Sequence, residues 1–312
     1  MSLAILLATY NGDKYLEEQI DSLLSQTYSD FTVYIHDDGS SDATKCIVKR
    51  FSETYPEKIT FLDYPSAGGA KNNFYSLLQR VESDCYMFCD QDDVWMPDKV
   101  ELSFKKLQET ETAYPDLPCL IFTDLRVVDY KLNTVSDSFM ECKGFSPEDH
   151  NFREILAHNI APGCTMLFNR KCRDLAVSIR SIDNFPMHDT LIMLAAEICG
   201  KVEYIDHQTI LYRQHSGNTV GLQERKFNEW FREKAANVMQ GIQLEKSREI
   251  VEWHRKMIPE ICSFHGILPE NQPIIEDLKS LSHVGKFERI RIYQRNHILK
   301  SDWKNTWKII LV

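Results

Sequence analysis

Short apolar runs alternate with amphipathic segments through the first 130 residues of the chain. The first amphipathic segment places Tyr15, Leu16, Ile20 and Leu23 at the spacing of one helix face. This alternation of strand-like and helix-like segments predicts an α/β fold, built from βαβ units around a mainly parallel sheet. We expect strands at residues 3–8, 31–36, 59–62 and 85–89, and helices that follow Gly12, Asp42, Gly69 and Pro97.

The pattern becomes mixed after Cys119 and helical after Gly221. The mixed part predicts a loop through Pro147 and a helix at residues 191–199. Its expected strands are residues 120–128, 164–168 and 202–212. The last part has long amphipathic segments without strand signals, the clearest at residues 224–257. We therefore expect a sheet-containing part over residues 1–220 and a helical part over residues 221–312.

Polar clusters follow the predicted strands where each strand ends. Thr-Tyr-Asn-Gly at residues 9–12 follows the first strand, Asp-Asp-Gly-Ser at residues 37–40 the second, and Asp-Gln-Asp-Asp at residues 90–93 the fourth. In an open α/β sheet the carboxyl ends of the strands line the ligand crevice. These clusters are therefore the candidate site.

Three carboxylates within four residues, at residues 90–93, repel one another unless a cation or hydrogen-bond donors neutralise them. Oxygen ligands favour Mg²⁺ or Mn²⁺, with positions left open for phosphate oxygens. The alternative is a solvated turn whose acids cap a helix. Asp37 and Asp38 could accept hydrogen bonds from a base or a ribose, but Asp-Asp-Gly-Ser is also ordinary turn chemistry.

Charge and cysteine usage narrow the function classes. The net charge of −10 argues against nucleic acid as a partner, because that affinity comes from Lys and Arg on the phosphate backbone. Nine cysteines without a Cys-x-x-Cys pair indicate free thiols in a reducing compartment, and we expect the cytoplasm. The start of the chain does not have the pattern of a signal peptide, and no apolar stretch is long enough to span a bilayer.

The motifs taken together resemble glycosyltransferase family 2. The resemblance rests on residues 6–12, 37–42, 68–73 and 90–95, in this order and spacing, and covers residues 3 to about 220. It implies the GT-A (Rossmann-like) fold and nucleotide-sugar donors. The Asp-Gln-Asp-Asp-Val-Trp form of residues 90–95 is similar to the rhamnosyltransferase branch, which builds bacterial cell-wall and surface polysaccharides. Residues 1–118 would then be the nucleotide-sugar half and residues 119–220 the acceptor half.

The resemblance also implies roles for individual residues. A divalent cation, Mg²⁺ or Mn²⁺, would be held by Asp92 or Asp93, with His215 reaching the metal or the diphosphate. Arg213 and His215 are two residues apart, so on an extended strand both would face one side. The residues expected to bind the nucleotide sugar are Thr9, Tyr10, Asn11, Asp37, Asp38, Lys71, Asn72, Asp90, Gln91 and Arg213.

The acceptor side of the expected site is formed by later motifs. Pro-Met-His-Asp at residues 186–189 resembles the family's acidic motif before a helix, whose last aspartate is the catalytic base. Many members have Glu-Asp where this chain has His188 and Asp189, and Asp189 could alternatively be a helix N-cap. The residues expected on the acceptor side are Gly163, Cys164, Trp95 and His188.

The resulting hypothesis is an inverting, metal-dependent glycosyltransferase. The expected donor is dTDP-L-rhamnose and the expected acceptor a saccharide, commonly lipid-linked in such pathways. A UDP-sugar donor is the alternative within this class, and a nucleotide-sugar-binding scaffold is the alternative outside it. A phosphatase of the haloacid dehalogenase type is disfavoured, because its nucleophilic aspartate usually follows the first strand, where this chain has Ala-Thr-Tyr-Asn.

The helical part differs in charge from the rest of the chain. Residues 221–312 carry 16 Lys and Arg against 12 Asp and Glu. Within residues 286–308, Phe287, Tyr293, Trp303 and Trp307 are interleaved with basic residues, a composition that suits the surface of an anionic bilayer. We expect peripheral contact with the inner face of the cell membrane, or alternatively a homodimer through these helices.

Overall fold

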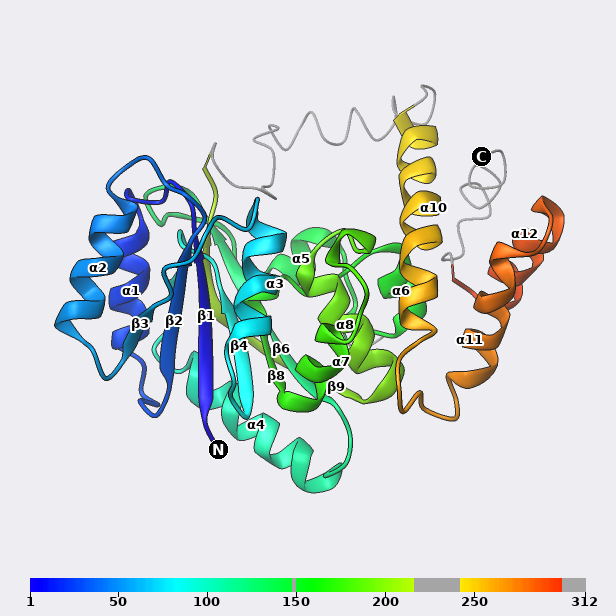
Figure 1. The fold of residues 1–312 in the computed structure, drawn as a ribbon, viewed down its shortest axis with the longest axis horizontal. Coiled ribbons are helices and arrows are strands. Elements are labelled where there is room, and N and C mark those ends of the chain that lie inside the picture. The colour runs from blue at the N-terminus through cyan, green and yellow to red at the C-terminus, as the bar shows by residue number, and fades with distance from the viewer. Residues whose placement is uncertain (148–149, 216–241, 299–312) are drawn as a thin grey trace.

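The computed structural model describes residues 1–147, 150–215 and 242–298. In these ranges the chain forms one sheet of order β3-β2-β1-β4-β8-β6-β9-β5, with β7 paired to β6 outside this path (Figure 1). The strands are β1 (Leu3–Thr9), β2 (Thr32–Asp37), β3 (Ile59–Phe61), β4 (Cys85–Cys89), β5 (Val94–Trp95), β6 (Cys119–Val128), β7 (Thr134–Ser136), β8 (Met166–Asn169) and β9 (Lys201–Arg213).

Most strands of the sheet run in one direction. β1, β2, β3 and β4 are mutually parallel, and β8 is antiparallel to both β4 and β6. β6 therefore runs parallel to β4, and β9 is parallel to β6. Only β5, β7 and β8 oppose this direction among the described strands. The structure confirms the expected α/β class with a mixed, mainly parallel sheet and flanking helices.

Alternate residues of the central strands feed two hydrophobic clusters on opposite faces of the sheet. Leu6 of β1 and Phe88 of β4 lie in one cluster, while Ile5 and Met87 lie in the other. Because both faces are covered, β1 and β4 are buried along their whole length. This explains why their sequences are continuous apolar runs rather than alternating ones.

Helices cover both faces of the sheet (Figure 1). The second cluster is closed by α1, α2 and α4, and the first by α3, α6, α7, α8 and the C-terminal helices. The helices are α1 (Leu16–Leu24), α2 (Thr44–Thr54), α3 (Ala70–Arg80), α4 (Lys99–Ala113), α5 (Phe139–Lys143), α6 (Phe152–Ala157), α7 (Arg170–Val177), α8 (His188–Cys199), α10 (Ile242–Ile261), α11 (Gln272–Lys279) and α12 (Lys286–Arg295).

The C-terminal helices are packed against the sheet-containing part. Met257 and Ile261 of α10 lie in the same cluster as Leu191 of α8, and Leu278 of α11 also joins it. The boundary expected at residues 220 and 221, and residues 224–241 of the expected long helix, lie outside the described residues. The described part of that helix continues past residue 257 to Ile261. Within the described residues, no helix is both long and apolar enough to cross a bilayer.

Several short elements differ from the expectation. The region expected to be a loop through Pro147 contains β7 and α5, and β5, α6 and α7 were also not predicted. α8 begins at His188, three residues before the predicted start. These elements are too short to show a clear period of apolar residues, so hydrophobic periodicity does not reveal them.

Candidate active site

The loops after β1 and β4 are held together by one side chain. The carboxamide of Gln91 accepts from the backbone N–H of Tyr10 at 2.8 Å and donates to the Tyr10 carbonyl at 2.9 Å. A Cβ at Gly12 would lie 2.2 Å from Gln91 Oε1, so only glycine leaves room for this pairing. Gln91, expected to bind the donor, therefore holds the loops after β1 and β4 together in the candidate site. Tyr10 stays 57% exposed beside it.

The loop after β2 is tied to the loop after β1 by Asn11. Its backbone N–H donates to Ser40 Oγ at 2.8 Å, and its Oδ1 accepts from the Ser41 N–H at 2.9 Å. Asn11 has a φ of 45°, a left-handed conformation that Asn tolerates better than most residues. The structure thus brings the first two polar clusters together at one edge of the sheet.

Asp37 is surrounded by donors from its own loop. Its carboxylate accepts from Thr9 Oγ1 at 3.1 Å, from the Gly39 N–H at 3.1 Å and from the Ser40 N–H at 2.8 Å. The Ser40 hydroxyl also donates to it. With these bonds the buried Asp37 and Thr9 organise the loop rather than present free groups to a ligand.

Asp38 anchors the glycine-rich turn that precedes α3. Burial opposes its charge, but hydrogen bonds outweigh that effect and hold the pKa of Asp38 below its usual value. Its Oδ1 accepts three of these bonds and its Oδ2 one, which leaves Oδ2 able to accept another. The donors are Ser66 Oγ at 2.7 Å and the N–H groups of Ala67, Gly68 and Gly69 at 2.6, 3.0 and 2.5 Å.

The acidic loop after β4 brings carboxylates into a poorly solvated space. Burial, followed by the charges of Asp92 and Asp189, raises the pKa of Asp90 to about 7. Burial and the charges of Asp92 and Asp90 also raise the pKa of Asp93 well above its usual value. Asp93 is fully buried, and its Oδ1 accepts from the Arg213 N–H at 3.0 Å. Its Oδ2 has no hydrogen-bond partner among the described residues.

Arg213 and His215 lie on the same side of the chain, as their spacing predicted. His215 Nε2 is 2.7 Å from Asp92 Oδ2, and Arg213 Nε donates to the Asp92 carbonyl at 2.7 Å. Both side chains also contact the ring of Tyr15, at 4.8 Å for the His215 ring and 4.5 Å for the Arg213 guanidinium. Arg213 is 2% exposed and also bonds Glu18. In the structure it clamps the acidic loop.

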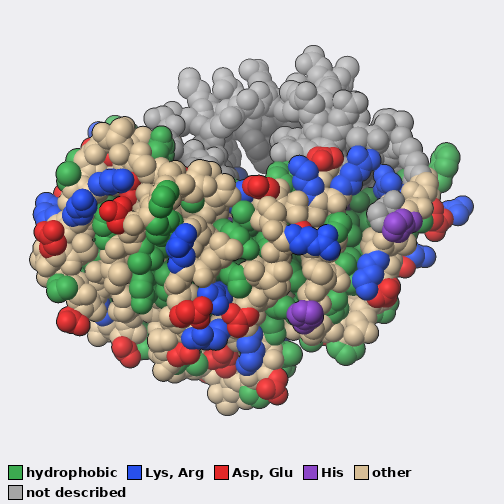
Figure 2. Space-filling model, in the orientation of Figure 1, with side chains coloured by type: hydrophobic (Ala, Val, Ile, Leu, Met, Phe, Trp, Pro, Cys, Tyr) green, Lys and Arg blue, Asp and Glu red, His purple; other side chains and the backbone are tan. Residues whose placement is uncertain are grey.

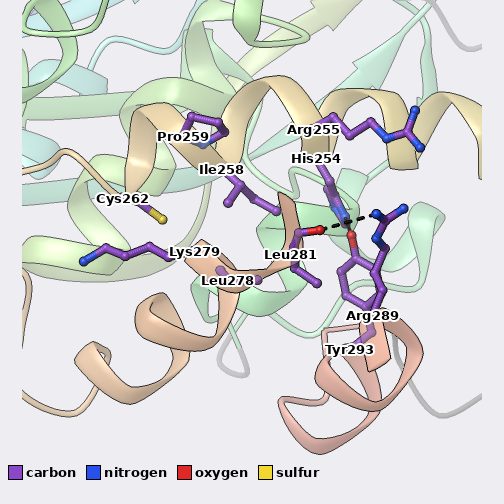
Figure 3. Close-up of a pocket in the computed structure, with 10 residues that line it drawn as sticks. All are labelled: His254, Arg255, Ile258, Pro259, Cys262, Leu278, Lys279, Leu281, Arg289 and Tyr293. Carbon is purple, nitrogen blue, oxygen red and sulfur yellow. Dashed lines mark hydrogen bonds between the residues drawn. The ribbon is translucent and has the colours of Figure 1, made fainter. Parts of the chain in front are cut away.

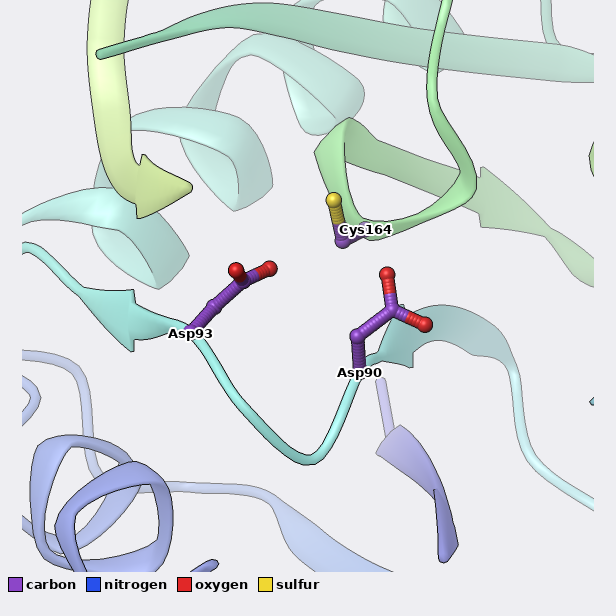
Figure 4. Close-up of side chains that lie close together, drawn as sticks. All are labelled: Asp90, Asp93 and Cys164. Atoms are coloured by element: carbon purple, nitrogen blue, oxygen red, sulfur yellow. The ribbon is translucent and has the colours of Figure 1, made fainter. Parts of the chain in front are cut away.

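Asp189 lies in the first turn of α8, opposite the acidic loop. Met187, not Asp189, is the N-cap of this helix, so the N-cap alternative for Asp189 is wrong. Burial raises the pKa of Asp189 despite hydrogen bonds from Thr190, Asn159 and the Gly163 N–H. Cys164 follows the Gly163 that lies against Asp189, and its Sγ is within 4.8 Å of an Asp90 oxygen (Figure 4), so both carboxylates lie near this loop.

Three residues expected on the acceptor side are buried. His188 is 5% exposed, stacks on Phe74 with ring centroids 4.2 Å apart, and meets Phe88 edge-on at 4.6 Å. Burial lowers the pKa of His188 to about 3, so it is neutral at physiological pH. Trp95 and Cys164 are 2% and 1% exposed and belong to the second cluster. None of these three side chains presents an open surface in this structure.

Gly163 places the backbone close to α8. A Cβ at this position would lie 2.9 Å from His188 Nε2 and 3.3 Å from Asp189 Cβ. The loop therefore approaches Asp189 only because residue 163 lacks a side chain.

The donor motif before α3 meets the C-terminal part of the chain. Lys71 Nζ donates to the Phe185 carbonyl at 3.1 Å, lies 3.7 Å from Asp183, and sits 5.7 Å from the centroid of the Trp253 ring. Asn72 Nδ2 donates to the Gly68 carbonyl at 3.1 Å. Trp253 of α10 thus lies near an expected donor-binding lysine, which the sequence did not indicate.

Lys99 was also missed. Its side chain is fully buried, with Nζ 3.4 Å from Thr209 Oγ1 and 4.6 Å from the centroid of the Trp95 ring. Burial lowers the pKa of Lys99 to about 8, although the charges of Cys164, Cys89 and Asp93 oppose that change. In the sequence Lys99 is a lysine at the start of a helix, a position that is ordinarily exposed, so its burial was not predicted.

The donor atoms of the acidic loop fit a divalent cation. Carboxylate oxygens gather at one strand end with an imidazole nitrogen beside Asp92, and one buried Asp93 oxygen is unpaired. Such hard oxygen donors with one nitrogen suit Mg²⁺ or Mn²⁺.

A separate cavity of about 500 Å³ lies between α10, α11 and α12 (Figure 3). Tyr293, one of the aromatic residues expected at a membrane surface, lines this cavity instead. Its side chain is buried, and its hydroxyl oxygen lies 3.1 Å from His254 Nδ1. Phe287 is 82% exposed. On the face in Figure 2, Lys and Arg side chains near the C-terminal helices are interspersed with acidic ones. Arg291 and Arg295 pair with Glu288 and Asp277, and residues 299–308 of the basic stretch lie outside the described residues.

Comparison with known sequences identifies related proteins. The family model Glycosyl transferase family 2 matches residues 4–175. The chain is 28% identical to dTDP-rhamnosyl transferase RfbG of Shigella flexneri over 74% of this chain and 83% of that protein. It is also 28% identical to the UDP-Glc:alpha-D-GlcNAc-diphosphoundecaprenol beta-1,3-glucosyltransferase WfgD of Escherichia coli, over 36% of this chain and 43% of that protein.

Solved structures share the fold. S. aureus TarS 1-349 in complex with UDP-GlcNAc superposes with a TM-score of 0.53 at 17% identity, covering 99% of this chain and 90% of that one. The mannosyltransferase PcManGT from Pyrobaculum calidifontis, in complex with GDP-Man and Mn²⁺, gives 0.52 at 14% identity, covering 99% and 84%. These similarities confirm the expected GT-A fold.

Proposed function

Because the chain belongs to glycosyltransferase family 2 and is thus a glycosyltransferase, we propose that it transfers L-rhamnose from dTDP-L-rhamnose to a saccharide acceptor, with inversion at the anomeric carbon. The observation that carries this proposal is that the loop at Gly163 and Cys164 contacts both Asp189 of α8 and Asp90 of the acidic loop after β4. The similarity to a dTDP-rhamnosyl transferase over 83% of its length supports the choice of donor.

The nucleotide of the donor would lie over the loops after β1 and β2. Asp38 Oδ2 retains capacity to accept a hydrogen bond from a base N–H, whereas Asp37 is occupied by its own loop. Tyr10 is exposed beside these loops and offers an aromatic face to the base. Lys71 and Asn72 would lie near the ribose and the diphosphate, as the family motif implies.

Asp189 would act as the general base. It accepts the proton of the acceptor hydroxyl as that oxygen bonds to the anomeric carbon, and the bond to the diphosphate breaks with its electron pair on the diphosphate. Its burial and raised pKa suit a carboxylate that must take a proton near neutral pH. Attack opposite the diphosphate inverts the anomeric carbon, so a β-linked donor gives an α-rhamnoside.

Asp92 or Asp93, together with His215, would hold the divalent cation. When bound, such a cation offsets the negative charge that develops on the leaving diphosphate. Arg213 contributes by holding the acidic loop, because its backbone N–H and its Nε both bond that loop. The acidic loop is thus presented in a fixed conformation.

The acceptor would approach from the side of Gly163 and Asp189. A lipid-linked saccharide is the proposed acceptor class, in keeping with the diphosphoundecaprenol-linked substrate in the name of the E. coli relative. That relative uses UDP-Glc by name, so a UDP-sugar donor is the second candidate. Peripheral membrane contact through the C-terminal helices, at the cytoplasmic face, belongs to the same proposal, and a homodimer through these helices is its alternative.

A panel of nucleotide sugars would test the donor. Bound ligand raises the midpoint of thermal unfolding by mass action, so each sugar is compared at equal concentration with and without excess chelator. We expect the largest increase with dTDP-L-rhamnose and a smaller one in chelator. A larger increase with a UDP-sugar would replace the proposed donor, and no increase with any nucleotide sugar would contradict the proposal.

A further inference from the structure

A buried carboxylate of α10 holds the connection between α7 and α8. Glu260 is 3% exposed and lies in the last turn of α10. Its Oε2 accepts from the Arg180 N–H at 3.0 Å, and its Oε1 accepts from Asn184 Nδ2 at 2.6 Å. Both donors belong to residues 178–187, which join the two helices. Burying a carboxylate is costly unless its oxygens are bonded, so Glu260 favours the one conformation of this connection in which both bonds form.

The same connection holds a lysine of the donor motif. The carbonyl of Phe185, the residue after Asn184, accepts from Lys71 Nζ at 3.1 Å. Phe185 is fully buried in the hydrophobic cluster that includes α8, which limits its movement. Asp183 lies 3.7 Å from Nζ, but its side chain is 76% exposed, so this ion pair contributes little. The position of Lys71 Nζ therefore depends on the connection that Glu260 holds.

We propose that Glu260 is a positioning residue for the nucleotide-sugar donor. It acts through Asn184 and the Phe185 carbonyl on Lys71, and so on the affinity for the donor diphosphate. An ammonium group has three N–H donors, so Lys71 can bond a phosphate oxygen while it keeps the Phe185 carbonyl. The inference rests on the proposed function, because that function places Lys71 near the diphosphate. Glu260 lies outside residues 4–175, the part of the chain that the family model matches.

The docking of α10 does not depend on this carboxylate alone. Met257, Ile258 and Ile261 of the same helix lie in one hydrophobic cluster with α8. Apolar contacts of this kind are not directional, and they leave the exact position of a neighbouring connection open. The two hydrogen bonds of Glu260 are directional and form only when residues 180 and 184 lie where the structure has them. Glu260 therefore adds position to a contact that apolar side chains already make.

Donor affinity of the full chain, measured by titration calorimetry, tests the proposal. The probe is the nucleotide sugar that stabilises the wild type most, expected to be dTDP-L-rhamnose. Glu260→Gln keeps the size of the side chain but turns an NH₂ group toward one of the two donors, so one bond is lost. We expect the donor dissociation constant to rise at least about threefold, the lower range for coupled residues of one hydrogen-bond network. Asn184→Ala removes the link from a partly exposed residue and should have a similar effect.

Two further variants separate positioning from stability. Ile261→Val, in the same turn of α10, removes a buried methyl group without altering a hydrogen bond, so it should leave donor affinity unchanged even if the protein unfolds at a lower temperature. In a chain that already carries Lys71→Ala, Glu260→Gln should have little further effect on donor affinity, because the group on which it acts is gone.

Three results would overturn the inference. The first is wild-type donor affinity in both Glu260→Gln and Asn184→Ala. The second is a full, independent loss of affinity when Glu260→Gln is added to Lys71→Ala, and the third is an equal loss in Ile261→Val, since docking of α10 would then explain the effect. These results would leave the proposed function intact. Failure of the wild type to bind any nucleotide sugar would instead contradict the proposed function, and this inference with it.

Discussion

At the scale of single residues, the site depends on carboxylates that the protein keeps poorly solvated. Asp90 and Asp189 both lie near the loop at Gly163 and Cys164, and burial raises the pKa of each. A carboxylate with a raised pKa is a stronger base, which suits proton transfer from an acceptor hydroxyl. Asp37, by contrast, is fully engaged with its loop. These three aspartates look alike in the sequence but differ in their capacity to accept a hydrogen bond or a proton from a ligand.

The assignment of Asp189 as base leads to the first prediction. Asp189→Asn removes the proton acceptor but keeps the size of the side chain, so the rate of transfer should fall by about 10² to 10⁴. Donor affinity should stay nearly unchanged, because the base acts on the acceptor. The measurements are turnover rate and donor dissociation constant. Wild-type turnover in the variant would move the base to another residue.

Steric room at Gly163 leads to the second prediction. In Gly163→Ala the new Cβ would press on His188 Nε2 at 2.9 Å and Asp189 Cβ at 3.3 Å. Displacement of a catalytic group by about 1 Å costs on the order of 10²-fold in rate, so kcat should fall by up to that factor. Gly285→Ala is the control, because nothing lies within 4 Å of its Cβ. Equal kcat in both variants would show that the loop is free to adjust.

At the scale of elements, the central strands were predictable and the short elements were not. β1 and β4 are buried on both faces, so their apolar runs are continuous and bounded by polar clusters. β5 has two residues and β7 three, too few to show a period. α7 carries basic residues beside its buried Cys172 and Leu175, which obscures its apolar face. Strand ends were enough to place the candidate site.

The fine structure of the site was less predictable from sequence. Gln91 pairs with the backbone of Tyr10, and Arg213 clamps the acidic loop, because loops far apart in sequence converge. Both residues had been expected to bind the donor. The burial of Trp95 was also not predictable, because an aromatic residue after an acidic motif can be either exposed or part of the hydrophobic core. Packing between distant segments decides such cases.

The docking of α10 leads to the third prediction, on acid stability. His254 is buried; its Nε2–H donates to the Leu156 carbonyl at 2.9 Å, and its Nδ1 accepts from the Tyr293 hydroxyl at 3.1 Å. Burial lowers the pKa of His254 from 6.5 to about 4. Between these pH values the unfolded chain binds a proton that the folded chain does not. The stability that neutral His254 contributes is therefore present above pH 6.5 and lost as the pH falls toward 4.

The free energy of unfolding as a function of pH measures this effect. Each such group contributes a slope of up to about 1.4 kcal/mol per pH unit. His254→Gln should remove this contribution, so the slope between about pH 4 and pH 6.5 should fall by up to about 1.4 kcal/mol per pH unit. This holds whatever the effect of the substitution on stability at neutral pH. An unchanged slope would mean that His254 does not stay neutral in the folded protein.

At the scale of the whole molecule, the C-terminal helices are part of the folded core as well as a candidate contact surface. Ile292 and Tyr293 of α12 lie in the hydrophobic cluster that α10 and α11 share with α8, so ending the chain before Lys286 would uncover apolar side chains of α10 and α11. A truncated chain would therefore confuse membrane contact with folding. The exposed Phe287 at the start of α12 offers a cleaner test.

The fourth prediction concerns this surface. If α12 contacts an anionic bilayer, Phe287→Ser should weaken co-sedimentation with anionic vesicles by about tenfold, the value expected for losing one buried aromatic side chain. Tyr55→Ser, at an exposed aromatic residue at the end of α2, is the matched control and should bind as the wild type does. High salt should weaken binding by all three proteins. Equal, negligible binding would favour oligomerisation as the role of these helices.

The central claim is that this chain is an inverting rhamnosyltransferase, and consumption of dTDP-β-L-rhamnose tests it most directly. The wild-type protein is incubated with this donor, with a divalent cation and with water as a slow acceptor, and the products are followed by NMR. The account predicts release of dTDP, with α-L-rhamnose as the first sugar product before mutarotation. A β product would contradict inversion. Binding of nucleotide sugars without consumption of any of them, in water or with lipid-linked saccharides, would show a binding module instead of an enzyme.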